Sequence, residues 1–332
     1  MTLVKECLET LAAGKDLSYE VSKEIFARFF DGQLEPAQSG ALLMGLRTKG
    51  ESEHEVWAAV ETALKRARTI ENLAGPLIDT CGTGGDGKHS FNCSTAVALF
   101  LADMGFKVVK HGNRAVSSKC GSADIVEQLG FPLVQDPEEA KEELEAKNFV
   151  FLFAPYFHPA FKNVVPIRKQ LGIRTLFNLM GPLLNPAHPT HQIIGVPQKQ
   201  FLSLVAKVLA KKRIECGCVV YGAGGFDELT PCGVNQVVLV ENEKLQNFEL
   251  DPGEYGFSLV QEKDLICPTK EQALIEQKKV LRGEGPKALQ EMVALNLGMV
   301  LYLLKQEADL KSCFDRARHK VAQGISNLKL NL

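Results

Sequence analysis

Four glycines fall between Gly82 and Gly87, directly after the apolar pair at 77–78. Glycine lets the backbone approach a ligand closely and adopt positive φ. A glycine turn between a strand and a helix also presents free N–H groups to an anion. The pattern is neither a Walker A loop nor a clean GxGxxG motif. A phosphate cradle is therefore favoured over a purely structural turn, without being established.

Polar side chains follow this turn at the start of an apolar segment. They are Ser90, Asn92, Ser94 and Thr95. Such residues commonly cap helices, which accounts for one of them but not for their density. Hydroxyl groups and free amides together suit a pyrophosphate and its metal ion.

A second candidate segment spans residues 110–122, after an expected strand at 106–109. Between Met104 and Ala123 the chain has no acidic residue and four basic ones: Lys107, Lys110, Arg114 and Lys119. Ser117, Ser118 and Ser122 add hydrogen-bond donors. Ligands of parallel sheets bind at the carboxyl ends of the strands, so an anion-binding loop is expected here. The alternative is a solvated basic loop.

Two further features bear on the ligand. Asp227 and Glu228 follow an expected strand at 218–221, and are either magnesium ligands or an ordinary surface pair. Arg168, on an expected helix, is either a surface residue or a bidentate partner for a substrate carboxylate. His158 is expected to be structural rather than an acid–base group.

The elements that position these residues divide the chain into two parts. Residues 1–72 show only helical patterns, including a capping box from Ser52 to Glu55. From residue 73 to 332, expected strands alternate with helices, which predicts an α/β domain with a mainly parallel sheet covered by helices. Part of 165–190 is expected to join the helical domain. Segments 234–240 and 245–250 predict a hairpin, and 270–331 predicts helix.

Composition limits the partners. The net charge of −2 gives no global field for nucleic acid or an acidic membrane. Nine scattered cysteines without CxxC spacing indicate reduced thiols and a cytoplasmic location. The N-terminus lacks a signal-peptide pattern, and no apolar run reaches the ~18 residues of a membrane span.

Several blocks, in order, resemble the anthranilate phosphoribosyltransferase family of the tryptophan pathway. They are Gly82-Thr-Gly-Gly-Asp86, Asn92-Cys-Ser-Thr95, Lys110-His-Gly-Asn-Arg-Ala-Val-Ser-Ser118, Gly121-Ser-Ala-Asp124, His158-Pro-Ala-Phe, Arg168, Gly172-Ile-Arg-Thr-Leu-Phe-Asn-Leu-Met-Gly-Pro182 and Asp227-Glu-Leu. The resemblance covers nearly the whole chain. It implies transfer of the phosphoribosyl group of 5-phosphoribosyl-1-pyrophosphate to anthranilate, which releases pyrophosphate.

The resemblance also implies roles for individual residues. The phosphoribosyl substrate would contact Gly82, Gly85, Asp86, Ser90, Asn92, Cys93, Ser94, Thr95, Lys110, His111, Gly112, Asn113, Arg114, Ala115, Val116, Ser117, Ser118 and Ser122. Anthranilate would contact Gly82, His111, Asn113, His158 and Arg168. Magnesium, at two ions per site, would bind Ser94, Asp227 and Glu228. Lys110, Asn113 and Arg168 would act by position and charge, and no essential general acid or base is expected. A homodimer through the N-terminal helices is implied as well.

Three alternatives stay open. A pyrimidine-nucleoside phosphorylase shares the expected fold, but the Asp227-Glu228 pair favours a metal-bound pyrophosphate. A non-catalytic homologue that binds nucleic acid is disfavoured by the net charge and by the lack of an extended basic face. A related transferase could accept a different aromatic amine.

Overall fold

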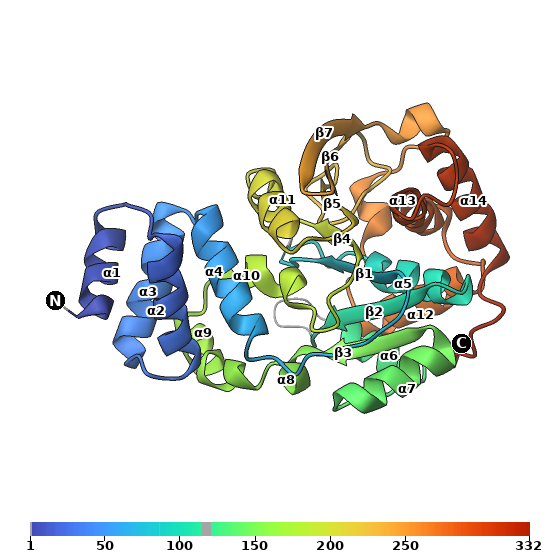
Figure 1. The fold of residues 1–332 in the computed structure, drawn as a ribbon. Helices are drawn as coiled ribbons and strands as arrows, with labels where there is room; N and C mark the ends of the chain where they lie inside the picture. The colour runs from blue at the N-terminus through green and yellow to red at the C-terminus, as the bar shows by residue number, and fades with distance from the viewer. Residues whose placement is uncertain (1, 86, 115–120) are drawn as a thin grey trace.

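The computed structural model describes residues 2–85, 87–114 and 121–332. A helical bundle at the N-terminus lies beside a larger part built on one sheet (Figure 1). The bundle consists of α1 (Leu3–Ala12), α2 (Tyr19–Phe30), α3 (Pro36–Lys49) and α4 (Glu53–Leu64). As predicted, α4 begins with a capping box, in which the Ser52 and Glu55 side chains each accept a backbone N–H of the other.

Later segments of the chain complete the bundle. α9 (Val165–Leu171) and α10 (Leu176–Met180) contribute Ile167, Leu176 and Phe177 to the same apolar core as Phe29 and Phe30. These contacts support the expected return of part of 165–190 to the helical part. The division at residues 72 and 73 stays a prediction.

The sheet has seven strands in the order β3-β2-β1-β4-β5-β6-β7. Their bounds are β1 (Leu77–Gly82), β2 (Lys107–Gly112), β3 (Phe149–Phe153), β4 (His191–Gly195), β5 (Cys216–Tyr221), β6 (Asn235–Glu241) and β7 (Lys244–Leu250). The first five are mutually parallel, and β6 and β7 form the predicted hairpin on the β5 edge. The predicted fold class, a helical domain plus a mainly parallel sheet, is confirmed.

Side chains on neighbouring positions of a strand enter different cores. Ile193 belongs to the core formed with α5 (Cys93–Asp103) and α13 (Lys287–Leu303), whereas Ile194 belongs to the core shared with α11 (Phe201–Lys211) and the bundle. This alternation places helices on both faces of the sheet. The remaining helices are α6 (Ser122–Gln128), α7 (Pro137–Lys147), α8 (Ala154–Phe157), α12 (Lys270–Leu281), α14 (Leu310–Gln323) and the short 3-10 segments η1 (Pro159–Asn163), η2 (Gly181–Leu184), η3 (Pro252–Tyr255) and η4 (Glu262–Leu265).

Several predicted boundaries were wrong. The strand expected at 106–109 is β2, Lys107–Gly112, so Lys110 and His111 lie in the sheet and not in a loop. The strand expected at 218–221 begins at Cys216. β1 extends beyond the apolar pair at 77–78 to Gly82, because this segment pairs in register with β4. The C-terminal helical region ends at Gln323 rather than at 331. The sequence pattern after Gln323 is apolar. The backbone N–H groups of residues 326–328, however, donate to a side chain and do not continue the helix.

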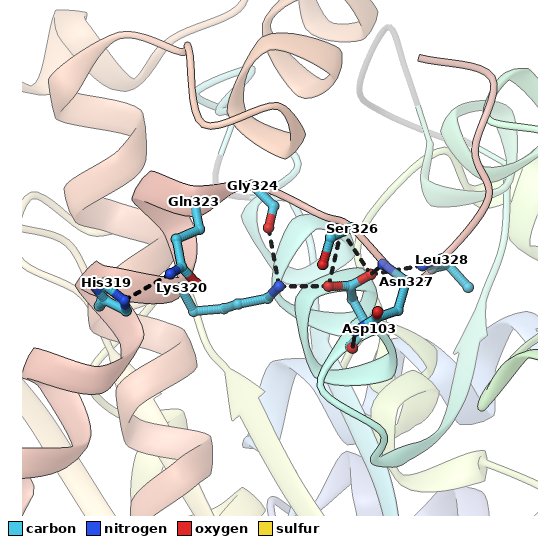
Figure 2. Close-up of polar contacts among 8 residues, drawn as sticks. All are labelled: Asp103, His319, Lys320, Gln323, Gly324, Ser326, Asn327 and Leu328. Atoms are coloured by element: carbon cyan, nitrogen blue, oxygen red, sulfur yellow. Dashed lines mark hydrogen bonds and ion pairs between the residues drawn. The ribbon is translucent and has the colours of Figure 1, made fainter.

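That side chain is Asp103, at the end of α5 (Figure 2). Its carboxylate accepts backbone N–H groups from Ser326, Asn327 and Leu328, and the Lys320 ammonium lies 2.5 Å from Oδ2. Burial alone would raise the pKa of the Asp103 carboxyl, but these hydrogen bonds bring it below its usual value. The contact ties the C-terminal tail to α5, the helix whose opposite end carries Ser94.

Candidate active site

A cavity of about 370 Å³ lies at the carboxyl ends of β1 and β2, and the loop after β5 borders it through Asp227 and Glu228. Most of the predicted site residues line it. They are Gly82, Gly85, Ser90, Asn92, Ser94, Lys110, His111, Gly112, Asn113, Arg114, Ser122, His158, Arg168, Asp227 and Glu228. The fold therefore brings segments far apart in the sequence to one edge of the sheet, where ligands of such folds bind.

Asp227 packs closely against the ends of two paired strands, β1 and β4. Gly82 of β1 pairs with Gly195 of β4. A Cβ on Gly82 would lie 2.2 Å from the Asp227 carboxylate, and a Cβ on Gly195 would lie 1.4 Å from its carbonyl oxygen. Neither glycine has a positive φ in this structure. Glycine is therefore required at both positions by the close approach of Asp227 and not by the backbone conformation.

The acidic pair accepts hydrogen bonds from the glycine turn and from the start of α5. The Gly84 N–H donates to Oδ2 of Asp227 at 2.8 Å. The Ser94 N–H, at the start of α5, donates to Oε1 of Glu228 at 3.2 Å. Asp227 and Glu228 thus line the cavity and are not an isolated surface pair.

Lys110 is almost completely buried, with 1% of its surface exposed. Its ammonium donates to the Thr80 carbonyl and lies 3.2 Å from Oγ of Ser94. Burial lowers the pKa of Lys110, an effect that the nearby Asp79 carboxylate opposes. A buried cation therefore lies directly beside the serine that the sequence assigns to metal binding.

The other end of the cavity is aromatic. The His111 and His158 rings meet edge to face with centroids 5.1 Å apart, and His158 stacks on Phe161 at 5.3 Å. Burial lowers the pKa of His158 to about 4 and holds the pKa of His111 well below its usual value. Both rings are therefore neutral at pH 7.

Arg168 supplies the positive charge at this end. Its guanidinium lies over the Phe177 ring, 5.1 Å from the centroid. Burial lowers the pKa of Arg168, but a guanidinium stays protonated in proteins. Neutral rings beside one guanidinium suit an aromatic carboxylate. The histidine rings would pack against the aromatic ring of the ligand, and the Arg168 guanidinium would bind its carboxylate.

The basic loop contributes less free charge than its sequence indicates. Lys107 pairs with Glu145 at 2.5 Å. Arg114 lines the cavity but is paired with Asp124 and Glu127 at 3.1 and 2.7 Å. Lys119 lies outside the described residues, as do Asp86, Ala115, Val116, Ser117 and Ser118.

Two predicted contacts do not line the cavity. Cys93 and Thr95 are fully buried, and the Cys93 thiol lies 3.7 Å from the Met292 carbonyl. Asn92, in contrast, is the N-cap of α5 but makes no side-chain cap hydrogen bond, and it lines the cavity.

Several residues that hold the site residues in place were not predicted from the sequence. Asn296 of α13 exchanges two hydrogen bonds with the backbone of Leu229, next to the acidic pair. Asp79 is fully buried and accepts from Asn185 and Gln192 below the site. Only Gly195, a glycine at the end of an apolar strand, carried a usable sequence signal.

Comparison with known proteins places this site in a family. Two family models match: the helical bundle domain of a glycosyl transferase family over residues 5–67, and its a/b domain over 74–326. An anthranilate phosphoribosyltransferase of Nitratidesulfovibrio vulgaris is 49% identical over 329 residues, which is 98% of this chain and 97% of that protein. The chain belongs to the anthranilate phosphoribosyltransferase family.

Solved structures of the family agree with the fold. The anthranilate phosphoribosyltransferase of Thermus thermophilus matches with a TM-score of 0.87 at 37% identity, over 96% of this chain and 95% of that one. The enzyme of Saccharomyces cerevisiae in complex with PRPP and Mg matches with a TM-score of 0.86 at 25% identity, over 96% and 93% of the two chains.

The residues present fit a magnesium ion. Mg²⁺ prefers oxygen ligands, and is often held by one or two carboxylates together with substrate phosphates and water. Asp227 and Glu228 supply two carboxylates beside the glycine turn, and Ser94 adds a hydroxyl. In the described part of the chain, no cluster of three or more His, Cys, Asp and Glu side chains forms a complete metal cage. These oxygen donors would therefore leave coordination positions on the metal ion for substrate phosphates.

Proposed function

We propose that this protein transfers the 5-phosphoribosyl group from 5-phosphoribosyl-1-pyrophosphate to the amino group of anthranilate. The products are N-(5-phosphoribosyl)anthranilate and pyrophosphate, in the second step of tryptophan biosynthesis from chorismate. One observation carries the proposal: a single cavity joins an acidic pair and glycine turn at one end to an arginine with aromatic rings at the other. The first end suits a metal-bound pyrophosphate and the second an aromatic carboxylate.

The pyrophosphate end acts by position and charge. Asp227, Glu228 and Ser94 would hold magnesium, which would supply positive charge to neutralise the leaving group; we propose two ions per site. The backbone N–H groups of Gly84 and Gly85 and the start of α5 bind the phosphate oxygens, whereas the Thr83 N–H donates to the Gly195 carbonyl. Lys110 holds Ser94 and adds a positive charge where negative charge develops. Preorganised donors of this kind stabilise a dissociating leaving group without moving during the reaction.

The anthranilate end orients the nucleophile. Arg168 binds the carboxylate, His111, His158 and Phe161 enclose the ring, and Gly82 and Asn113 also contact anthranilate. The amine of anthranilate is neutral at pH 7, so its attack needs no strong base. The lowered pKa values of both histidines make them weak proton acceptors, which fits a mechanism based on proximity and orientation.

An activity assay tests this function. The protein is mixed with Mg²⁺, 5-phosphoribosyl-1-pyrophosphate and anthranilate, and anthranilate fluorescence is followed. We expect the fluorescence to fall only when all three are present. Unchanged fluorescence, together with phosphorolysis of thymidine or uridine, would instead support the nucleoside phosphorylase alternative. Consumption of another aromatic amine in place of anthranilate would support the third alternative.

A homodimer through the N-terminal helices is part of the proposal. Val4, Leu8 and Leu11 of α1, with Ala41 and Gly45 of α3, line a groove on the bundle, and Met44 beside it is 40% exposed. A second copy of the chain would cover this apolar surface. Sedimentation should show a dimer that Leu8→Glu combined with Met44→Glu dissociates. Ile275→Glu, on the exposed face of α12, is the matched control and should stay dimeric.

The cellular setting completes the proposal. None of the helices in the described ranges has the length and apolar character needed to cross a membrane. Eight cysteines in those ranges are free thiols. Thiols persist in reducing compartments, which supports the proposed cytoplasmic location.

A further inference from the structure

Arg174, between α9 and α10, contacts the glycine turn from outside the cavity. Its guanidinium donates to the carbonyl oxygens of Gly84, at 2.8 Å, and of Gly85. A Cβ on Gly85 would lie 2.5 Å from Nη1 of Arg174, so the contact needs a glycine there. The one guanidinium therefore binds two successive carbonyl groups of the turn.

The same turn is held on its other side by Asp227. The Gly84 N–H donates to Asp227, and the Gly84 carbonyl accepts from Arg174. A turn that binds an anion must direct N–H groups toward it and carbonyl oxygens away from it. If Asp227 held a metal ion, the Gly84 N–H would be left to donate to a phosphate oxygen, while Arg174 would still hold the carbonyl side.

Arg174 is itself fixed by the helical bundle. Arg47, in the last turn of α3, donates to the Arg174 carbonyl. The following residues form a tight turn, in which the Thr175 N–H donates to Oδ1 of Asn178 at 3.0 Å. Hydrogen bonds thus hold both the Arg174 carbonyl and the N–H of the next residue. They fix the backbone from which the Arg174 guanidinium reaches the glycine turn.

We propose that Arg174 is a positioning residue for pyrophosphate. By holding the carbonyls of Gly84 and Gly85, it keeps the N–H groups of the turn directed toward the leaving group, and it links this turn to the helical bundle through Arg47. The inference rests on the proposed function for the identity of the anion. It assigns a role in that site to a residue that does not line the main cavity.

The test measures binding and catalysis separately in Arg174→Met and Arg174→Lys. Calorimetry with magnesium and pyrophosphate gives the Kd, and steady-state kinetics give the KM of each substrate. We expect Arg174→Met to raise the Kd and the KM of the phosphoribosyl substrate about 10-fold, the scale of one charge-assisted hydrogen bond. The anthranilate KM should change less than about 3-fold. Arg174→Lys should be intermediate, because an ammonium lacks the two-pronged donor geometry.

Controls separate this role from a general loss of structure. Arg28→Met removes a guanidinium that pairs with Glu24 on the surface of α2 and should leave all values unchanged. If Arg174→Met does not fold, Arg174→Gln keeps one donor group and takes its place. An unchanged pyrophosphate Kd, or equal increases in both KM values, would overturn the proposal. Because pyrophosphate binding needs no anthranilate, the Kd decides the role of Arg174 even if the transferase assay fails.

Discussion

The Asp227 carboxylate accepts the backbone N–H of Gly84 at 2.8 Å, so a proposed metal ligand also fixes the glycine turn that we propose binds phosphate. The two residues belong to loops that follow β5 and β1, with β4 between those strands in the sheet. Their contact couples the metal end of the cavity to the backbone donors of the leaving-group site. Changes that move Asp227 should therefore affect both.

The space around Asp227 gives the first prediction. In Gly195→Ala, the new Cβ would overlap the Asp227 carbonyl, which lies 1.4 Å from its position. We expect activity to fall roughly 100-fold, the effect of displacing a catalytic group by about 1 Å. Gly253→Ala is the matched control, since a Cβ there comes no closer than 3.2 Å to a neighbouring atom. Wild-type activity in Gly195→Ala would show that the position of Asp227 does not matter.

The charge of the acidic pair, Asp227 and Glu228, gives the second prediction. Asp227→Asn combined with Glu228→Gln keeps the shape of both side chains but removes the two negative charges. We expect kcat/KM to fall about 1000-fold, because a metal clamp contributes several kcal/mol to such reactions. The Mg²⁺ concentration for half-maximal rate should also rise. Turnover with an unaltered magnesium dependence would mean that the pair has no role in metal binding.

The third prediction concerns recognition of the carboxylate. Arg168→Ala should raise the anthranilate KM about 10- to 100-fold, the range of a charged hydrogen bond, with a smaller effect on the phosphoribosyl substrate. Arg168→Lys should recover part of this loss, since it restores the charge without the bidentate geometry. Equal effects on both substrates would remove Arg168 from the carboxylate role.

Much of this architecture follows from local sequence signals. Asp136 and Pro137 are typical of a helix start, and α7 begins at Pro137, where the Asp136 side chain accepts the N–H groups of Glu138 and Glu139. The alternation of strands and helices predicted the parallel sheet, and the polar segment after Val240 predicted the hairpin of β6 and β7. These features are encoded within about ten residues, where capping and periodicity act directly.

The arrangement within the site is not local, and was only partly predictable. The sequence suggested that Asp227 and the glycine turn belong together, but not that Gly195 makes room for Asp227. Arg114 appeared as a free cation, whereas in the fold it pairs with Asp124 and Glu127. Arg174 falls within the block 172–182 that carries the resemblance, but the sequence did not indicate its partners, because they are carbonyl oxygens that any residue possesses.

The buried histidine gives a fourth prediction, on stability. The pKa of His158 is about 4 in the folded state and near 6.5 in an unfolded chain. The unfolded state therefore binds more protons between these values, and stability is lost as the pH falls from about 6.5 to 4. His158 should account for about 2 kcal/mol of the stability lost between pH 7 and pH 5.

Urea unfolding of wild type and His158→Phe at the two pH values measures this contribution. Phenylalanine keeps a ring beside Phe161 but does not titrate, so the variant should lose less stability on acidification. Groups remote from His158 titrate in both proteins and cancel in the comparison, whereas the pKa of His111, which His158 lowers, changes with the substitution. An identical loss in both would show that His158 is not held neutral by burial.

The most direct test of the whole site is a crystal structure with Mg²⁺, pyrophosphate and anthranilate, which cannot react together because the ribose is absent. We predict metal bound by the carboxylates of Asp227 and Glu228, pyrophosphate on the N–H groups of the glycine turn, and the anthranilate carboxylate on Arg168. Anthranilate bound away from Arg168, or metal bound away from the acidic pair, would contradict the account.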